Sequence, residues 1–212
     1  MDEERLKTWE TLFRRALTLI DSAASAGATL GEWSFGGGTV LMRRHRHRFS
    51  KDVDIFVGDP QLLGYLSPRL NPTAESLTPD YVEQSGSLKL RFPEGEIDFV
   101  VGAPLTPEPT VSESLFGRDV RVETSTEIIA KKVWYRGDQF TPRDLFDLAM
   151  VTEKERAALH AIQPILRSKR RTILDRVAAN EAAFREAFAL LEVLDYRRSF
   201  DECLALVRRS LT

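Results

Sequence analysis

The sequence predicts an α+β protein in two lobes, a strand-rich part followed by a helical part. Short runs up to Val122 alternate apolar and polar residues, which is the period of a half-buried strand. From Ser125 to the end, apolar residues recur at spacings of three and four, which is the period of an amphipathic helix. We therefore expect a catalytic lobe at 1–123 and a helical lobe at 124–212.

Composition excludes several classes of protein. The 212 residues are 42% hydrophobic and 29% charged, as in a globular chain with a sizeable core. No apolar run approaches the roughly 20 residues of a membrane span. The N-terminus MDEERLKTW is charged where a signal peptide would be apolar, so we expect a cytoplasmic protein with no membrane partner. The single Cys203 is expected to be a packing residue.

The first elements lead to a glycine turn. Residues 3–24 carry apolar side chains on one helical face, and Trp33–Phe35 is expected to form a short strand. Gly36, Gly37 and Gly38 follow, and Thr39 is placed to cap a helix from Val40 to about Arg46. Glycines allow the backbone to approach a ligand, and a helix start favours an anion. The spacing fits neither a Walker A loop nor a Rossmann fingerprint.

Two aspartates interrupt the next strand, Asp52 to Val57. Residues i and i+2 of a strand share a face, so Asp52 and Asp54 point together while Val53, Ile55 and Val57 enter a core. Adjacent carboxylates repel each other unless a cation lies between them. Mg²⁺ carrying the phosphates of a nucleotide fits this pattern best.

A third aspartate belongs to a predicted hairpin. After a surface segment with a short helix near Pro60–Leu66, the runs 88–92 and 97–101 alternate around the turn at 93–96. Asp98 is on the opposite face from Ile97 and Phe99, where it can join the aspartate pair, although an exposed aspartate on a half-buried strand is the alternative. The segment Asp119–Val122 is predicted as an edge strand.

Helices are predicted from Ser125 onwards, with breaks near Gly137–Thr141, Val151 and Pro164. The first runs to Arg136. Thr141, Pro142 and Asp144 have the pattern of a second helix start.

Two cationic runs stand out against a net charge of -2. Arg43–Arg48 directly precedes the aspartate pair, which favours a polyanion site, whereas Lys169–Arg171 is interpreted as a solvated helix face. His45 and His47 are separated by two positions, which on a helix directs them to different faces, so a zinc pair is not expected.

Two blocks of the sequence together resemble the AbiEii/AbiGii toxin nucleotidyltransferases. The first, GGGTVLMRRHRHRFSKDVDIFV, is similar to that family's Gly-Gly-Ser/Thr turn, helix, His-Arg-x-Ser step and Asp-x-Asp. The second, EIIAKKVWYRGDQFTPRDLFDL, is similar to its Ile/Leu-Ala-x-Lys helix followed by Arg-Asp-Leu-x-Asp-Leu. The matching residues are Gly37, Gly38, Thr39, His47, Arg48, Ser50, Asp52, Asp54, Lys132, Arg143, Asp144 and Asp147.

The resemblance implies a polymerase-β-like nucleotidyltransferase fold, with a small mixed sheet flanked by helices and a C-terminal helical lobe. It also implies a toxin of a toxin–antitoxin or phage-defence system, with a cognate antitoxin as partner. Some members transfer nucleotides to the acceptor end of tRNA. The chain is short for the family, so the C-terminal region that would select the acceptor is reduced.

The implied reaction is transfer of NMP from an NTP to an RNA acceptor, with tRNA as the expected acceptor and two Mg²⁺ ions, or Mn²⁺, as cofactor. Its expected metal ligands are Asp52, Asp54 and Asp98. The expected nucleotide-binding residues are Gly37, Gly38, Thr39, Arg48, Ser50 and Lys132. Lys131 is the rival of Lys132 as the cation that neutralises a phosphate. Asp147 is included among the catalytic residues, although Asp144 and Asp147 are equally consistent with a helix cap or an ion pair.

Two other functions are compatible with the sequence. The acceptor can be a small molecule, such as an aminoglycoside, or a protein hydroxyl, although cations beside the site favour a polyanion. The fold can also serve as a catalytically silent module that binds a nucleotide or a partner.

Overall fold

The computed structural model describes residues 3–28 and 31–212, and the chain divides into two compact units. The sheet unit comprises Met1–Val40, Ser50–Ala103 and Thr110–Glu123. The helical unit comprises Leu41–Phe49, Pro104–Pro109 and Thr124–Thr212. Two short segments that precede residue 124 therefore belong to the helical unit. The division into a catalytic lobe at 1–123 and a helical lobe at 124–212 stays a prediction.

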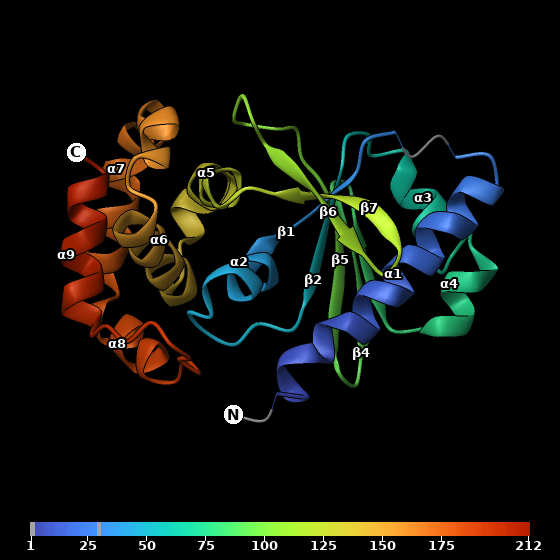
Figure 1. The fold of residues 1–212 in the computed structure, drawn as a ribbon, viewed down its shortest axis with the longest axis horizontal. Coiled ribbons are helices and arrows are strands. Elements are labelled where there is room, and N and C mark those ends of the chain that lie inside the picture. Colours follow the sequence, from blue (N-terminus) through green and yellow to red (C-terminus); the bar gives the residue numbers. More distant parts are fainter. Residues whose placement is uncertain (1–2, 29–30) are drawn as a thin grey trace. The chain divides into compact units, whose positions relative to one another are not determined.

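The sheet unit contains a seven-stranded mixed sheet with the strand order β3-β4-β5-β2-β1-β7-β6 (Figure 1). Strand β2 pairs in parallel with β5, as does β1 with β7, and the other neighbours are antiparallel. The strands are β1 Ser34–Gly36, β2 Val53–Val57, β3 Tyr81–Gln84, β4 Ser87–Phe92, β5 Gly95–Val101, β6 Thr110–Leu115 and β7 Arg118–Glu123.

The structure confirms the predicted hairpin, since β4 and β5 pair from Ser87↔Val100 to Phe92↔Gly95. The prediction of an edge strand at Asp119–Val122 was wrong. Strand β7 lies between β1 and β6, and β6 forms the edge. Strand β6 was not predicted, because its sequence, TVSESL, has few apolar residues. An edge strand of this kind buries little of either face.

Helices cover the apolar face of the sheet. In Figure 1, α1, α3 and α4 lie along this face. Phe13 of α1 packs against Phe35 of β1 with ring centroids 4.6 Å apart, and Trp9 stacks on Phe35 at 5.8 Å. Each fully buried aromatic side chain contributes roughly 1.5–3 kcal/mol to folding. These helices and the turn before them are η1 Arg5–Lys7, α1 Thr8–Ser25, α3 Leu62–Leu66 and α4 Pro72–Leu77.

Helix α2, Gly37–His45, continues directly from β1. Its first four residues belong to the sheet unit and the rest to the helical unit. The helix ends where Arg46 adopts a positive φ of 48°. The chain then runs extended: Phe49 N–H donates to Glu192 O, and Leu194 N–H to His47 O.

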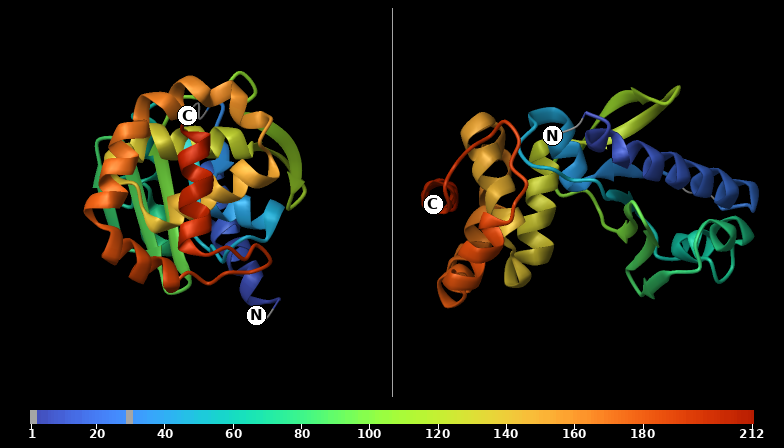
Figure 2. Two further views of the ribbon diagram at one scale, coloured as in Figure 1. Left: turned by 90° about the vertical axis from the view of Figure 1, so that its left-hand side faces the viewer. Right: turned by 90° about the horizontal axis from the view of Figure 1, so that it is seen from below.

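The helical unit is organised around α6. The side chains of this helix from Leu145 to Val151 are all fully buried. Helices α5, α8 and α9 pack on α6, and α7 packs on α5 (Figure 2). The elements are α5 Ser125–Arg136, η2 Gly137–Gln139, α6 Pro142–Lys154, η3 Ala158–Ile162, α7 Gln163–Ala179, α8 Glu181–Ala189 and α9 Phe200–Ser210.

The boundaries of α5 are those predicted, and α6 starts as predicted with Thr141 as its N-cap in a capping box. The break predicted near Val151 lies slightly later, because α6 continues to Lys154 with Val151 buried inside it. Cys203 is buried on α9, as expected of a packing residue. No helix among residues 3–28 and 31–212 is long and apolar enough to cross a membrane.

Candidate active site

Acidic side chains gather on the face of the sheet opposite the apolar core. In the parallel register of β2 and β5, Asp54 lies beside Asp98, and in the antiparallel register of β5 and β4, Asp98 lies beside Lys89. The neighbours Val53 and Ile55 are fully buried on the other face. The alternation predicted for these strands therefore brings two of the three predicted metal ligands side by side.

Asp52 directly precedes β2 and is fixed by the hairpin turn. Its Oδ1 accepts a hydrogen bond from Glu96 N–H at 3.0 Å. Gly95 leaves room for this contact, because a Cβ at this position would lie 2.9 Å from Asp52 Oδ1. The turn of the hairpin thus holds Asp52 at the same end of the sheet as Asp54.

One lysine serves two of these carboxylates. Lys89 Nζ donates to Asp98 Oδ2 at 2.8 Å and also to Glu96. Burial raises the pKa of Asp98, and the negative charges of Glu96 and Asp52 raise it further, against the opposing effect of Lys89. The pKa of Lys89 is also raised, because its two carboxylate partners outweigh its burial. The cluster therefore holds more negative charge than its own lysine balances.

The glycine turn is shaped around Asp54. Gly37 has a φ of 75°, and a Cβ at this position would lie 1.8 Å from Asp54 Oδ2. Only glycine fits both the positive φ and this contact. Because α2 begins at Gly37, Asp54 lies against the first residue of the helix.

The prediction that Thr39 caps the helix was wrong. Thr39 is the third residue of α2 and is fully buried. Its hydroxyl donates to the main-chain oxygen of Asp52 at 2.5 Å and lies 3.2 Å from the hydroxyl of Ser50. The helix begins at Gly37, three residues earlier than predicted, which leaves Thr39 to tie α2 to the start of β2.

A further carboxylate, Glu123 at the end of β7, was missed from the sequence. It is 1% exposed and accepts from Ser34 Oγ at 3.0 Å. A Cβ on Gly36 would lie 2.2 Å from Glu123 Oε2, so Gly36 makes room for it. Since Gly36 also pairs with Asp54, Gly36 and Gly37 are flanked by two acidic side chains. The signal available in the sequence was the position of Glu123 directly after the alternating Val120 and Val122.

The donor chemistry of this face fits a hard divalent cation. Asp52, Asp54 and Asp98 offer carboxylate oxygens, and Lys89 leaves part of their charge uncompensated. Within residues 3–28 and 31–212, no group of three or more His, Cys, Asp or Glu side chains is placed to hold a metal ion. Mg²⁺ is commonly held by one or two carboxylates together with substrate phosphates, so this arrangement fits it.

The helical unit contains a separate buried ion cluster centred on Asp147. Arg48 donates to both carboxylate oxygens of Asp147, from Nε at 2.7 Å and from Nη2 at 2.8 Å. His47 Nε2 lies 2.8 Å from Oδ1, and Lys132 Nζ lies 3.1 Å from Oδ2. Lys132 also binds Asp144 at 2.6 Å. The Asp147 cluster thus joins three of the predicted site residues, Arg48, Lys132 and Asp147.

Charge balance defines the protonation of this cluster. Burial alone would raise the pKa of Asp147, but Arg48 and Lys132 hold it well below its ordinary value. Burial lowers the pKa of His47 despite Asp147. His47 Nδ1 has no hydrogen-bond partner among the described residues, as expected of a neutral ring that donates through Nε2. Asp147 therefore stays ionised beside a neutral His47.

The interpretation of Arg43–Arg48 as one continuous polyanion site needs correction. His47 is fully buried and Arg48 is 4% exposed, because the extended chain after α2 turns both toward Asp147. His45 instead lies 2.7 Å from Glu155, so the two histidines do not share a site. Lys131 is bound to Glu127 at 3.5 Å, away from the partners of Lys132. Asp144 completes the capping box of α6.

A model of the family described as nucleotidyl transferase AbiEii toxin, type IV toxin–antitoxin system, matches residues 19–209. The chain belongs to this family. It is therefore a nucleotidyltransferase of the AbiEii toxin family, as the two sequence blocks indicated. No curated protein matches the sequence.

Solved structures share the AbiEii chain's fold. A candidate nucleotidyltransferase from Helicobacter pylori aligns over 100% of this chain and 94% of its own, with 16% identity and a TM-score of 0.54. JHP933 from Helicobacter pylori aligns over 100% and 91%, with 15% identity and a TM-score of 0.53. MenT4, a nucleotidyltransferase toxin from Mycobacterium tuberculosis, aligns over 93% and 80%, with 18% identity and a TM-score of 0.47. The two Helicobacter pylori alignments confirm the predicted nucleotidyltransferase fold.

Proposed function

We propose that this chain is a Mg²⁺-dependent toxin that transfers NMP from an NTP to RNA, with the acceptor end of tRNA as substrate, and so blocks translation. The observation that carries the proposal is the juxtaposition of Asp54 with Asp98 on one side and with Gly37 on the other. Carboxylates that hold a metal therefore adjoin a helix start that can receive phosphates.

The triphosphate is assigned to the start of α2. The N–H groups of Gly37 and Gly38 belong to the first turn of this helix, where backbone donors and the helix dipole favour an anion. Ser50 lies beside the buried hydroxyl of Thr39 and is retained as a hydroxyl donor to the nucleotide. Thr39 acts by positioning Asp52 and Ser50.

Asp52 and Asp54 would hold Mg²⁺, with Asp98 as the third carboxylate. When bound, Mg²⁺ would neutralise phosphate charge and increase the acidity of the attacking hydroxyl. Asp98 is assigned to receive the proton of the acceptor hydroxyl, since its burial already favours the protonated form. Lys89 holds Asp98 and Glu96 in place through its two ion pairs.

Lys132, which was expected to neutralise a phosphate directly, is proposed instead to stabilise the Asp147 cluster. Asp147 and Asp144 bind its ammonium and fix its position. Arg48, which was expected to contact the nucleotide directly, is proposed to act through Asp147, because both of its bonded nitrogens donate to this carboxylate. A cognate antitoxin is proposed from the family description, type IV toxin–antitoxin system.

Transfer of label tests the function. The protein is incubated with total tRNA, Mg²⁺ and each α-labelled NTP in turn, and label in the tRNA is measured after electrophoresis. Asp54→Asn should abolish labelling, and chelation of Mg²⁺ should do the same. The matched control is Asp119→Asn, which makes the same chemical change at an exposed position of β7 and should leave labelling intact.

Failure to label tRNA with any of the four NTPs would overturn the acceptor assignment. Full activity of Asp54→Asn would overturn the assignment of the metal site.

A further inference from the structure

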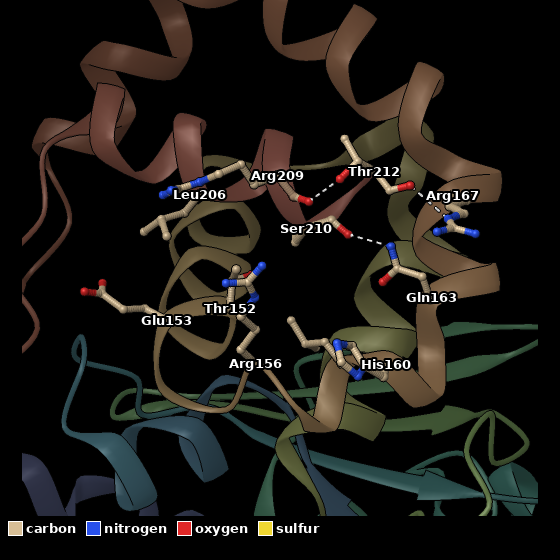
Figure 3. A pocket seen from close by; sticks show the side chains of 11 residues that line it. Thr152, Glu153, Arg156, His160, Gln163, Arg167, Leu206, Arg209, Ser210 and Thr212 are labelled. Carbon is tan, nitrogen blue, oxygen red and sulfur yellow. Dashed lines mark hydrogen bonds between the residues drawn. The ribbon is translucent and has the colours of Figure 1, made fainter.

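The helical unit carries a pocket of about 600 Å³ between the end of α6, η3, α7 and α9 (Figure 3). Three arginines from different parts of this unit line it: Arg156 after α6, Arg167 on α7 and Arg209 on α9. His160 of η3 also lines it. The Asp147 cluster and the sheet carboxylates contribute no lining residue, so this arginine pocket is distinct from both.

Two of the three arginines in the pocket have no acidic partner among the described residues. Arg156 and Arg209 are exposed, and neither side chain forms a hydrogen bond or ion pair with any residue in the described part of the chain. Arg167 donates from Nε to a main-chain oxygen of Thr212 at 2.9 Å, which orients its guanidinium, so the positive charge without an acidic partner is that of Arg156 and Arg209. Arginines held in this state are suited to phosphate, which accepts two parallel N–H donors.

The single acidic residue in the lining, Glu153, is already bound elsewhere. Arg198 donates to both its oxygens, at 2.6 Å and 3.1 Å, and Tyr196 Oη donates at 2.8 Å. Figure 3 shows the Glu153 carboxylate pointing away from Arg156 and Arg209. The balance of charge at the pocket therefore stays positive.

The shape and lining favour an extended polyanion over a small metabolite. The arginines are exposed, whereas a small phosphorylated ligand is usually enclosed by its site. No described Phe, Tyr or Trp side chain lines the pocket, so the imidazole of His160 is the one ring in the lining on which a base could stack. Arg170, one turn beyond Arg167 on α7, is exposed and has no ion-pair partner among the described residues, which extends the charge beyond the pocket.

We propose that the arginine pocket binds the phosphate backbone of the RNA acceptor. The proposal rests on the proposed function for its choice of RNA, and it adds a second contact area that the sheet carboxylates do not supply. Backbone contacts of this kind increase affinity for any RNA and carry no sequence information. Binding through the pocket is therefore expected to be strongly dependent on salt.

The test measures binding of fluorescein-labelled total tRNA to the full chain by anisotropy, across a series of salt concentrations. Arg156→Gln combined with Arg209→Gln should raise the Kd about tenfold or more at 0.1 M salt, and should reduce the slope of log K against log salt by about two. The control combines Arg69→Gln with Arg118→Gln. It removes the same charge from exposed arginines of the sheet unit that are paired with Glu83 and Asp21.

A second variant separates charge from folding. Arg156→Lys with Arg209→Lys keeps both charges and should retain most of the salt slope while losing the bidentate contacts. Thermal melts of all three variants establish that the fold is intact. A Gln variant whose Kd and slope equal those of the control would overturn the inference.

The two proposals fail in different ways. Labelling of tRNA by a wild-type protein whose RNA affinity does not depend on Arg156 and Arg209 would overturn the inference and leave the proposed function standing. RNA binding that depends on both arginines, without labelling by any NTP, would support the inference and overturn the proposed function. Polyglutamate serves as an acidic peptide probe. If the Gln variant loses the polyglutamate binding of the wild type while its RNA affinity is unchanged, the pocket would be assigned to a protein partner and the inference overturned.

Discussion

Gly37 and Asp54 are in direct contact: a single carbon added to the glycine would lie 1.8 Å from the carboxylate oxygen. The contact joins the first residue of α2 to the second residue of β2. The glycine turn and the aspartate strand, which are separate in sequence, therefore constrain each other. The following predictions test this contact and the ion pairs described above.

Gly37→Ala should reduce nucleotidyl transfer by about a hundredfold or more, because the new methyl group must displace the Asp54 carboxylate. Gly117→Ala is the matched control. Gly117 has a φ of 76°, close to the 75° of Gly37, but a Cβ there meets nothing within 4 Å. Both variants should lose about 1–3 kcal/mol of stability from backbone strain. Equal activity of the two variants, measured by tRNA labelling, would contradict the steric argument.

Lys89→Gln should tighten binding of Mg²⁺ by roughly three- to tenfold, because it removes a positive charge next to Asp98 and Glu96. Titration of NTP binding with Mg²⁺ by calorimetry measures this shift. Lys51→Gln, at a half-buried lysine outside this ion pair, is the comparison. Weaker Mg²⁺ binding in Lys89→Gln would mean that the lysine organises the carboxylates more than it competes for them.

Asp147→Ala should destabilise the protein by about 3–5 kcal/mol, since Arg48 and Lys132 would lose the carboxylate that binds both. Urea denaturation followed by circular dichroism measures the free energy of unfolding. Asp195→Ala removes an exposed partner of Arg46 and should cost no more than about 1 kcal/mol. Similar losses in the two variants would show that burial of the Asp147 cluster adds nothing to the free energy of unfolding.

Stability should fall as the pH decreases below about 6.5, the ordinary pKa of histidine. Because the pKa of His47 is lowered in the folded state, the unfolded chain binds a proton there that the folded chain does not. This loss amounts to at most about 1.4 kcal/mol per pH unit, down to the folded pKa. The pKa of Asp147 is also lowered, but that contribution is lost only at more acidic pH, below the ordinary pKa of aspartate.

Denaturation of His47→Gln at a series of pH values isolates this contribution. The variant should show a flatter dependence than the wild type between about pH 7 and pH 5. His160→Gln, at an exposed histidine, should keep the wild-type dependence. An unchanged slope in His47→Gln would assign the effect to another group.

Local patterns were sufficient for much of the sheet and part of the site. Alternation predicted the hairpin and the shared face of Asp54 and Asp98, because side-chain direction in a strand follows from sequence position alone. The capping pattern at Thr141 likewise gave the start of α6. At Thr39 the same reasoning was wrong, because the glycines before it are themselves helical.

Contacts between distant segments were not predictable in this way. Arg48 and Asp147 are 99 residues apart, and nothing local to either distinguishes a buried ion pair from a solvated charge. The burial of Glu123 depends on space left by Gly36 on another strand. The arginine pocket likewise draws its charges from three separate segments. Such features depend on tertiary packing, which sequence periodicity does not specify.

The assignment of Leu41–Phe49 to the helical unit limits how the gene can be rearranged. A recombination event that exchanged only the part encoding 124–212 would deliver an Asp147 without its original Arg48 and His47. The incoming helices would then bury an aspartate whose partners came from a different ancestor. We therefore expect a chimera that exchanges 124–212 alone to be less stable than one that exchanges 41–49 together with it.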